Sequence, residues 1–318
     1  LAAGSAAYAW LAGRRAAHAQ VQLLGWLEAG VAVTALALAP AFQWLPNLVL
    51  VLARWTGVSA EGAFLAQFGL SALVMLPPVT LLGAALPCAV AVCARGSASL
   101  GRDVGRVYAA NTLGTVAGAI AAGFILLPSL GAQGSIAVAA TANAAIGATL
   151  IATPRGLSAA RRRAAAVVLA GAFAGGLWLV PKWDPRVMAG GVSVYLTRFA
   201  FASDPAALFR EVTGSRSLLF YREGASATIA VERSAQMTSL RVNGKVDASN
   251  GADMPTQYLL GHLPLLLHPR PERVLIIGLG SGVTAGAVAQ HPDVKEMEVA
   301  ELEPAVVEAA RFFEVENR

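Results

Sequence analysis

A glycine-rich turn followed by one acid is the part of the chain best suited to chemistry. Gly278, Gly280 and Gly282 come directly after the apolar stretch Val274-Leu-Ile-Ile and before a run with helical spacing. Glycines there let the backbone turn tightly and approach a ligand, while the start of the helix offers free N–H groups. Glu301 lies 21 residues beyond Gly280, at the end of the next strand-like stretch, where a carboxylate can accept hydrogen bonds from both ribose hydroxyls. The pattern predicts a nucleoside-binding site.

The spacing within the turn discriminates between classes of nucleoside-binding protein. A dinucleotide oxidoreductase is disfavoured, because the turn lacks the third-glycine spacing of GxGxxG. A methyltransferase often has an acid two residues before the first glycine, and here that position is Ile276. A purely structural role is the remaining alternative, in which the glycines only permit close helix-sheet packing and Glu301 is a solvated strand end.

Three polar residues near the turn are the next candidates for ligand contacts. Ser281 lies within the turn, and Asp253 and Gln257 stand four residues apart on one helix face just ahead of the strand. An exposed helix start would explain Asp253 equally well. The histidines and cysteines have no metal-ligand spacing, so no metal site is predicted at His262, His268, His291, Cys88 or Cys93.

The elements that must position these residues form two small regions. Residues 215–254 contain β-branched and aromatic strand patterns with an Asn243-Gly244 hairpin signal, and they predict a small β-subdomain. Residues 255–318 predict a helix over 255–267, then strand 274–277, helix 283–290, strand 296–300 and helix 304–313. This order is the N-terminal part of a Rossmann-like, methyltransferase-like fold, which the chain contains only in truncated form.

The composition of the chain, and above all of its N-terminal part, is that of a membrane protein. Of the 318 residues, 56% are hydrophobic and 14% charged, which excludes a disordered chain. Up to Lys182 there are eleven Lys and Arg against three acids, a net charge of +8, and beyond it thirteen against sixteen, a net charge of −3. Because the basic residues lie in short loops between apolar runs, nucleic acid is excluded as a partner. The predicted fold class is an α-helical transmembrane bundle followed by an α/β domain.

The transmembrane domain is expected over residues 1–181, with a linker over 182–214. Charge-free runs of spanning length predict about six helices, and the adjacent Pro77 and Pro78 predict a break or kink in the third. Gly114 and Gly118 form a small-residue seam suited to close helix contact. The runs cover 1–11, 21–42, 63–93, 107–128, 135–153 and 164–180.

Loop charges predict the orientation of these helices. Arginine clusters follow the first, third and fifth runs, whereas residues 128–134 carry no charge. By the positive-inside rule the odd-numbered runs end in the cytoplasm, so the sixth would deliver everything after Pro181 to the non-cytoplasmic side. The lipid bilayer is therefore an expected partner.

The chain resembles the spermidine synthase (aminopropyltransferase) family. The resemblance lies in "HLPLLLHPRPERVLIIGLGSGVTAGAVAQHP" and "EVAELEPAVVEAARFF", and the strands between residues 217 and 247 fit that family's N-terminal β-domain. The apolar half, particularly "GRVYAANTLGTVAGAIAAGFILLPSLG", is similar to bacterial membrane proteins in which a multi-pass, transporter-like region is fused to such a domain.

The resemblance implies roles for the residues of the turn. Gly278, Gly280 and Gly282 would hold the nucleoside of decarboxylated S-adenosylmethionine, and Glu301 would be the ribose-binding acid. The implied reaction transfers an aminopropyl group to putrescine or a related diamine. Decarboxylated S-adenosylmethionine, or S-adenosylmethionine itself, would be a cosubstrate, and no tightly bound cofactor is expected.

The chain departs from the family pattern at several positions. Ser281 replaces an Asp, Ala227 falls near the place of a Gln, and Thr256-Gln257 falls near a Tyr-His pair. The sequence given stops at Arg318, before the acidic loop that supplies the family's catalytic Asp, the general base for the amine. No catalytic residue is therefore assigned, and a fragment of a longer protein is expected.

Two hypotheses of different classes follow. The first is a membrane-bound spermidine synthase-like transferase. The second is a transporter-like or scaffold membrane protein whose domain binds a nucleoside without catalysis, and an S-adenosylmethionine-dependent methyltransferase is a further alternative. The departures at Ser281, Ala227 and Gln257 and the expected outside location favour the second, whereas the intact turn with Glu301 favours the first. A homo-oligomer is left open.

Overall fold

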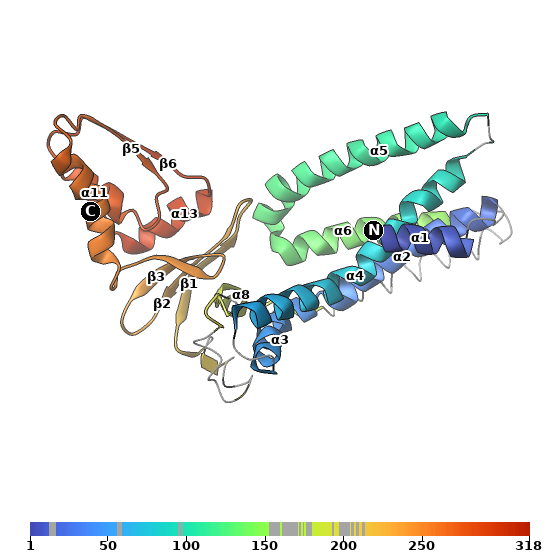
Figure 1. The fold of residues 1–318 in the computed structure, drawn as a ribbon, viewed down its shortest axis with the longest axis horizontal. Coiled ribbons are helices and arrows are strands. Elements are labelled where there is room, and N and C mark those ends of the chain that lie inside the picture. Colours follow the sequence, from blue (N-terminus) through green and yellow to red (C-terminus); the bar gives the residue numbers. More distant parts are fainter. Residues whose placement is uncertain are drawn as a thin grey trace. The chain divides into compact units, whose positions relative to one another are not determined.

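The computed structural model divides into two units (Figure 1). One unit comprises Leu1–Leu45 and Leu65–Lys182, and the other comprises Pro46–Phe64 and Trp183–Arg318. The residues that the structure describes are 1–12, 17–55, 59–94, 96, 98–152, 160, 171, 173, 175, 180–192, 194–196, 204, 207, 210, 211 and 214–318.

The N-terminal half is helical. Three segments of the described residues are long and apolar enough to cross a membrane, judged by length and composition: Ala19–Leu38, Glu61–Cys93 and Leu100–Ala152. Most of the run predicted over 164–180 lies outside the described residues, as do Arg14, Arg15, Arg155 and the arginines at 161–163. The helices are α1 (Ala2–Ala12), α2 (Ala17–Leu38), α3 (Ala41–Trp55), α4 (Ala60–Cys93), α5 (Leu100–Ala121), a π-helical turn (Ala122–Leu126) and α6 (Leu127–Ala152).

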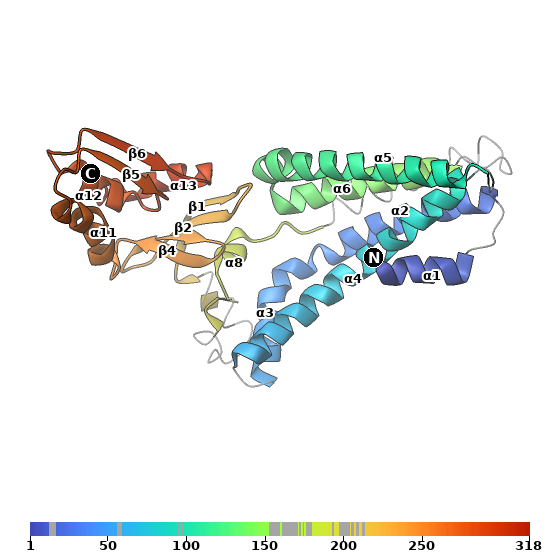
Figure 2. The same cartoon turned by 45° about the horizontal axis from the view of Figure 1, so that its top comes forward.

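The third predicted run is not broken. Helix α4 continues through Pro77 and Pro78, so the break is wrong, and the kink that was its alternative stays a prediction. Proline has a backbone φ that fits a helix and removes only its own N–H donor, so a long apolar helix can tolerate two. Within α6, Gly131 adopts the non-helical angles φ 70° and ψ 177°, and the chain reverses in the uncharged stretch where a connection was predicted (Figures 1 and 2).

Close helix contact uses other glycines than the predicted seam. Helices α2 and α6 approach at Gly25 and Gly147, where a Cβ on Gly147 would lie 2.8 Å from the Gly25 carbonyl oxygen. Gly114 and Gly118 of α5 are exposed, and a Cβ on either would meet no described atom within 4 Å. Small residues at Gly25 and Gly147 thus let these two backbones come together, as in membrane helix pairs.

The C-terminal half contains two sheets, and its strands fall where they were predicted. Strands β1 to β4 form an antiparallel sheet in chain order, and β5 pairs with β6 in parallel (Figure 2). The elements are α8 (Pro185–Ala189), β1 (Ser217–Glu223), β2 (Thr228–Arg233), β3 (Thr238–Val242), β4 (Lys245–Ser249), α11 (Met254–Leu267), β5 (Arg273–Ile277), α12 (Val283–Ala289), β6 (Glu296–Ala300), α13 (Pro304–Ala309) and a 3₁₀ turn (Ala310–Phe313).

The predicted hairpin turn is confirmed at Asn243-Gly244. Both residues have positive φ, 50° and 81°, which is the geometry that joins two antiparallel strands through two residues. The Asn243 side chain also accepts a hydrogen bond from the Thr228 N–H at 2.9 Å. The turn therefore fixes the β3–β4 register and ties it to β2.

One hydrophobic core joins the antiparallel sheet to the Rossmann-like part. Ile229, Val231 and Leu240 from the sheet pack with Ala309 of α13 and with Phe313, all of them buried. Successive strand residues point to opposite faces, so the neighbours Glu232 and Arg241 lie on the face away from α13. Leu279 of the glycine-rich turn packs against this core, so the turn rests on residues of the antiparallel sheet and of α13.

The first described part of the predicted linker packs on this sheet. In the stretch from Trp183 to Leu196, helix α8 contacts β1 and β2, and the Tyr195 hydroxyl accepts a hydrogen bond from the Val246 N–H at 2.9 Å. A Cβ on Gly191 would lie 2.1 Å from the Gly244 carbonyl oxygen, so glycine permits this approach. These residues are part of the C-terminal unit.

Candidate functional site

The glycine-rich turn has the conformation that its sequence predicts. It connects β5 to α12, and Gly278, Gly280 and Gly282 have φ of 89°, 58° and 83°. The Gly278 N–H donates to the Ala300 carbonyl of β6 at 2.8 Å, which anchors the start of the turn. A Cβ on Gly278 would meet no described atom within 4 Å, so backbone conformation and not packing requires glycine there.

Glu301 follows β6 and reaches the turn. One carboxylate oxygen accepts a hydrogen bond from the Leu279 N–H at 2.8 Å, and the other accepts from the Glu303 N–H at 2.9 Å. The carboxylate is therefore fixed beside the turn, as its place at the end of the second parallel strand predicts. A carboxylate has about four lone-pair sites, so each oxygen retains acceptor capacity for a ligand hydroxyl.

The structure brings together Ser281, Gln257 and Asp253. Ser281 is 2% exposed, and its hydroxyl donates to the Gln257 side-chain oxygen at 2.5 Å. The Gln257 amide donates to the Ser249 carbonyl at 2.8 Å and to Asp253 at 3.0 Å. Asp253 in turn accepts from the Ser249 N–H. These side chains bond to one another and link β4, α11 and the turn, and their contact with a ligand stays a prediction.

Glu303 supports the site, and the sequence reasoning did not identify it. Its buried carboxylate accepts hydrogen bonds from the N–H groups of Ser226 at 3.0 Å, Ala227 at 3.4 Å and Ala305 at 3.3 Å. It therefore caps α13 and also holds the β1–β2 turn. An acid just before a proline-initiated helix is a recognisable cap signal, but the contact with Ser226 and Ala227 spans more than seventy residues and has no local signal.

Asn317 is a second supporting residue that was missed. Its side-chain amide donates to the Ser281 carbonyl at 2.9 Å and to the Ala310 carbonyl at 3.1 Å. A Cβ on Gly282 would lie 2.9 Å from the same amide nitrogen. Asn317 thus holds the turn against the residues that follow α13.

The histidines include one unexpected contact. His262 Nδ1 lies 2.8 Å from His291 Nε2, which joins α11 to the residues after α12. Among the described residues no group of three His, Cys, Asp or Glu side chains could hold a metal ion.

These features define a class of domain. A parallel strand, a glycine-rich turn, a helix and an acid at the end of the next strand form the first half of a Rossmann-like domain. Residues 254–315 match the family model of the spermine/spermidine synthase domain. Over these residues the chain is therefore similar to the spermine/spermidine synthase domain, and the curated relatives that it matches are spermidine synthases and polyamine aminopropyltransferases.

The matches to individual relatives are partial. The spermidine synthase of Dictyostelium discoideum is 35% identical over 74 residues, 23% of this chain and 26% of that protein. The polyamine aminopropyltransferase of Mycobacterium tuberculosis strain H37Rv is 26% identical over 265 residues, 79% of this chain and 46% of that protein. The chain spans less than half the length of these relatives.

Two solved structures are also similar. A spermidine synthase from Thermotoga maritima has 27% identity and a TM-score of 0.29, covering 30% of this chain and 34% of that one. A spermidine synthase in complex with the transition state analogue AdoDATO has 25% identity and a TM-score of 0.30, covering 31% and 36%.

Proposed function

We propose that the protein is a multi-pass membrane protein whose C-terminal unit binds the nucleoside of decarboxylated S-adenosylmethionine for aminopropyl transfer to a diamine such as putrescine. The observation that carries the proposal is Glu301, which two backbone N–H groups hold beside the glycine-rich turn. A carboxylate fixed in this way is oriented before a ribose arrives, so less ordering opposes binding. The match of residues 254–315 to the synthase family supports the same ligand class.

The chemistry of the transfer separates binding from base catalysis. The lone pair of an amine nitrogen attacks the carbon next to the sulfonium, so that a C–N bond forms, the C–S bond breaks and methylthioadenosine leaves. The nitrogen must also give a proton to a general base. We assign Gly278, Gly280, Gly282 and Glu301 to binding and orientation, and we assign the base to none of the residues described.

Glu301→Gln tests the ligand site directly. Titration of decarboxylated S-adenosylmethionine into the full chain in detergent micelles is expected to show binding by calorimetry. Glu301→Gln should weaken it about tenfold, because a neutral amide accepts more weakly from a ribose hydroxyl than a carboxylate does. Glu298→Gln, an exposed change on β6 just before Glu301, should leave the affinity unchanged. Equal affinities of the wild type and Glu301→Gln would remove Glu301 from the site.

The same titration distinguishes an aminopropyltransferase from the alternative, a methyltransferase. S-adenosylmethionine differs from the decarboxylated form by one carboxylate. Tighter binding of S-adenosylmethionine would support methyl transfer in place of aminopropyl transfer.

A second candidate function is nucleoside binding without catalysis. It is favoured by the hydrogen bonds among Ser281, Gln257 and Asp253, because these side chains are already engaged with one another. In this case decarboxylated S-adenosylmethionine would bind, but adding putrescine would release no methylthioadenosine. Release of methylthioadenosine would exclude the non-catalytic candidate.

The proposed location is a bacterial inner membrane with the C-terminal unit on the non-cytoplasmic side. Gln236 is exposed in the β2–β3 turn, and Ala98 is exposed between α4 and α5. In a Cys93→Ser background, an impermeant maleimide should label Gln236→Cys in cells with an intact inner membrane and should not label Ala98→Cys. Label on Gln236→Cys that needs inner-membrane disruption would reverse the orientation.

A further inference from the structure

A cavity of about 390 Å³ lies on the sheet face away from α13, and its lining includes Asp253 but none of the residues 278–282 of the glycine-rich turn. Its size falls in the range of small-molecule sites. Its floor comes from β2, β3 and β4, where Glu232 pairs with Ser239 and Ser239 pairs with Ser249 across the strands. All three are buried. Buried polar groups around a cavity indicate a polar occupant, since an apolar core would leave them unpaired.

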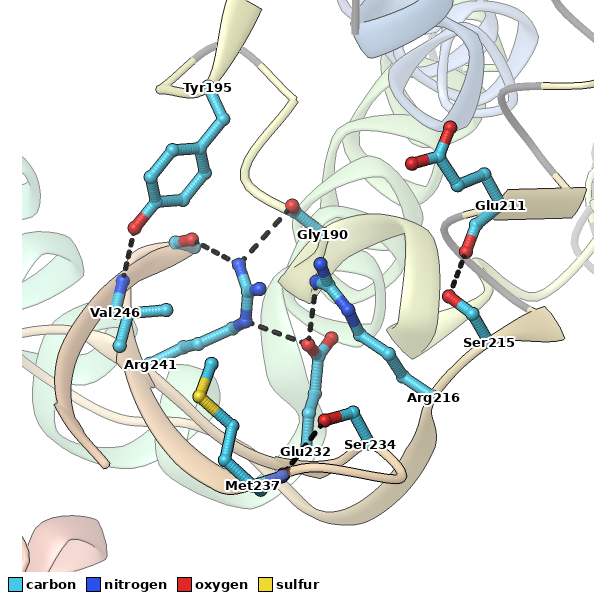
Figure 3. Close-up of polar contacts among 11 residues, drawn as sticks. Gly190, Tyr195, Glu211, Ser215, Arg216, Glu232, Ser234, Met237, Arg241 and Val246 are labelled. Atoms are coloured by element: carbon cyan, nitrogen blue, oxygen red, sulfur yellow. Dashed lines mark hydrogen bonds and ion pairs between the residues drawn. The ribbon is translucent and has the colours of Figure 1, made fainter. Parts of the chain in front are cut away.

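Two arginines in the wall share one acid. Arg216 Nη1 lies 3.1 Å and Arg241 Nε 2.7 Å from the same oxygen of Glu232 (Figure 3). The exposed fractions of the side chains are 16% for Arg216, 4% for Arg241 and 3% for Glu232. The cluster therefore holds two positive charges and one negative charge out of water. Such an imbalance is costly unless another negative charge compensates it.

The guanidinium groups have more donors than acceptors around them. Each guanidinium carries five N–H donors. Arg241 Nη1 donates to the Gly244 carbonyl at 2.8 Å and to the Gly190 carbonyl at 3.4 Å, and its Nε is paired with Glu232 at 2.7 Å (Figure 3). Within the described part of the chain, Arg216 donates only to Glu232. The surplus donors suit a ligand that is rich in oxygen acceptors.

Two further acids, Asp247 and Asp253, line the cavity. Asp247 lies 3.1 Å from Lys245 Nζ, and Asp253 accepts hydrogen bonds from Ser249 and Gln257. Burial lowers the pKa of Arg241 from its ordinary value; Glu232 opposes this shift and the charge of Arg216 adds to it. At the end of the cavity beside Glu232 the two arginines thus share one acid, and the charges of Asp247 and Asp253 lie elsewhere in the lining.

We propose that this cavity binds a small oxyanion, a carboxylate or a phosphate group, through Arg216, Arg241 and the hydroxyl of Ser239. Ser239 is 4% exposed, lines the cavity and has no hydrogen-bond partner for its hydroxyl among the described residues. Tyr195 forms another wall, with its ring 5.8 Å from the Arg241 guanidinium carbon. The site therefore joins the stretch after Trp183 to the sheet, and a bound anion would hold the two together.

Binding of simple anions to the full chain in detergent micelles tests the proposal. Phosphate and acetate are titrated at constant ionic strength against chloride, and the unfolding temperature and direct binding are followed. One of the two should bind saturably with one site per chain, and which one binds identifies the ligand class. Arg216→Gln should weaken this binding about tenfold, because it removes one charge-assisted hydrogen bond and leaves the Glu232–Arg241 pair intact.

The matched control is Arg222→Gln. Arg222 lies on β1 and pairs with Glu308, away from the cavity lining, so its loss should leave anion binding unchanged. Ser239→Ala removes only a hydroxyl and serves as a second variant if Arg216→Gln unfolds. Phosphate, acetate and chloride acting alike on the wild type would overturn the proposal. An equal loss in Arg222→Gln would overturn it too, since it would show a general effect of surface charge.

Discussion

Replacing Glu303 by alanine is expected to destabilise the C-terminal unit by about 3 kcal/mol. The carboxylate is buried and accepts three backbone hydrogen bonds, from Ser226, Ala227 and Ala305. Alanine would leave these N–H groups without their acceptor and would remove the cap of α13. A side chain of this kind holds two separate elements at once, so its loss should loosen the β1–β2 turn and α13 together.

Glu308→Ala is the matched control for this change. It removes a carboxylate from the same helix, but one that pairs with Arg222 where the two side chains are 38% and 46% exposed. Such surface pairs contribute less than about 1 kcal/mol. Pulse proteolysis of the full chain in urea, in detergent micelles, reports both free energies of unfolding. Similar losses of unfolding free energy in the two variants would show that the buried contacts of Glu303 stabilise the unit no more than an exposed ion pair does.

Much of the C-terminal unit could be predicted because its signals are local. Asn243-Gly244 forms a two-residue hairpin wherever strands flank it, and a glycine-rich turn between a buried strand and a helix has few alternative conformations. The placement of Glu301 follows from the parallel pairing of β5 and β6, which brings the ends of both strands to one edge. For this reason the acid and the turn were found from spacing alone.

The supporting contacts had no comparable signal. Glu303 meets Ser226 and Asn317 meets Ser281 only because the chain folds back over many residues. Gln257 and Ser281 were expected to face a ligand, and the structure shows that they bond to each other. Spacing identifies which polar residues come together, but it does not tell which of them use their hydrogen bonds internally.

The helical half was predicted in outline and less well in detail. Its runs are apolar on every side, so sequence periodicity does not show which face meets another helix. Helix α3 followed α2 where no helix was expected, and Gly25 with Gly147 made the close contact that was expected at Gly114 and Gly118. Partner choice between such helices depends on tertiary packing, which local patterns do not encode.

Replacing Gly282 by alanine should cost about 2 to 3 kcal/mol of the free energy of unfolding of the C-terminal unit. Gly282 has φ 83°, a left-handed conformation in which a Cβ costs about 1 to 2 kcal/mol. The new Cβ would also lie 2.9 Å from the Asn317 amide nitrogen, which donates to the carbonyls of Ser281 and Ala310. Alanine must therefore displace Asn317 and weaken its hold on the turn.

Gly278→Ala separates the cost of the left-handed backbone from the cost of displacing Asn317. Gly278 has φ 89°, but its Cβ would meet no described atom within 4 Å, so only the backbone cost applies. In the same proteolysis experiment Gly282→Ala should be the more destabilising of the two. In an Asn317→Ala background the difference should vanish, because the side chain that the new Cβ displaces is already absent. If Gly278→Ala and Gly282→Ala cost the same in the wild-type background, Asn317 does not hold the turn, and the conformation of the glycines alone accounts for its shape.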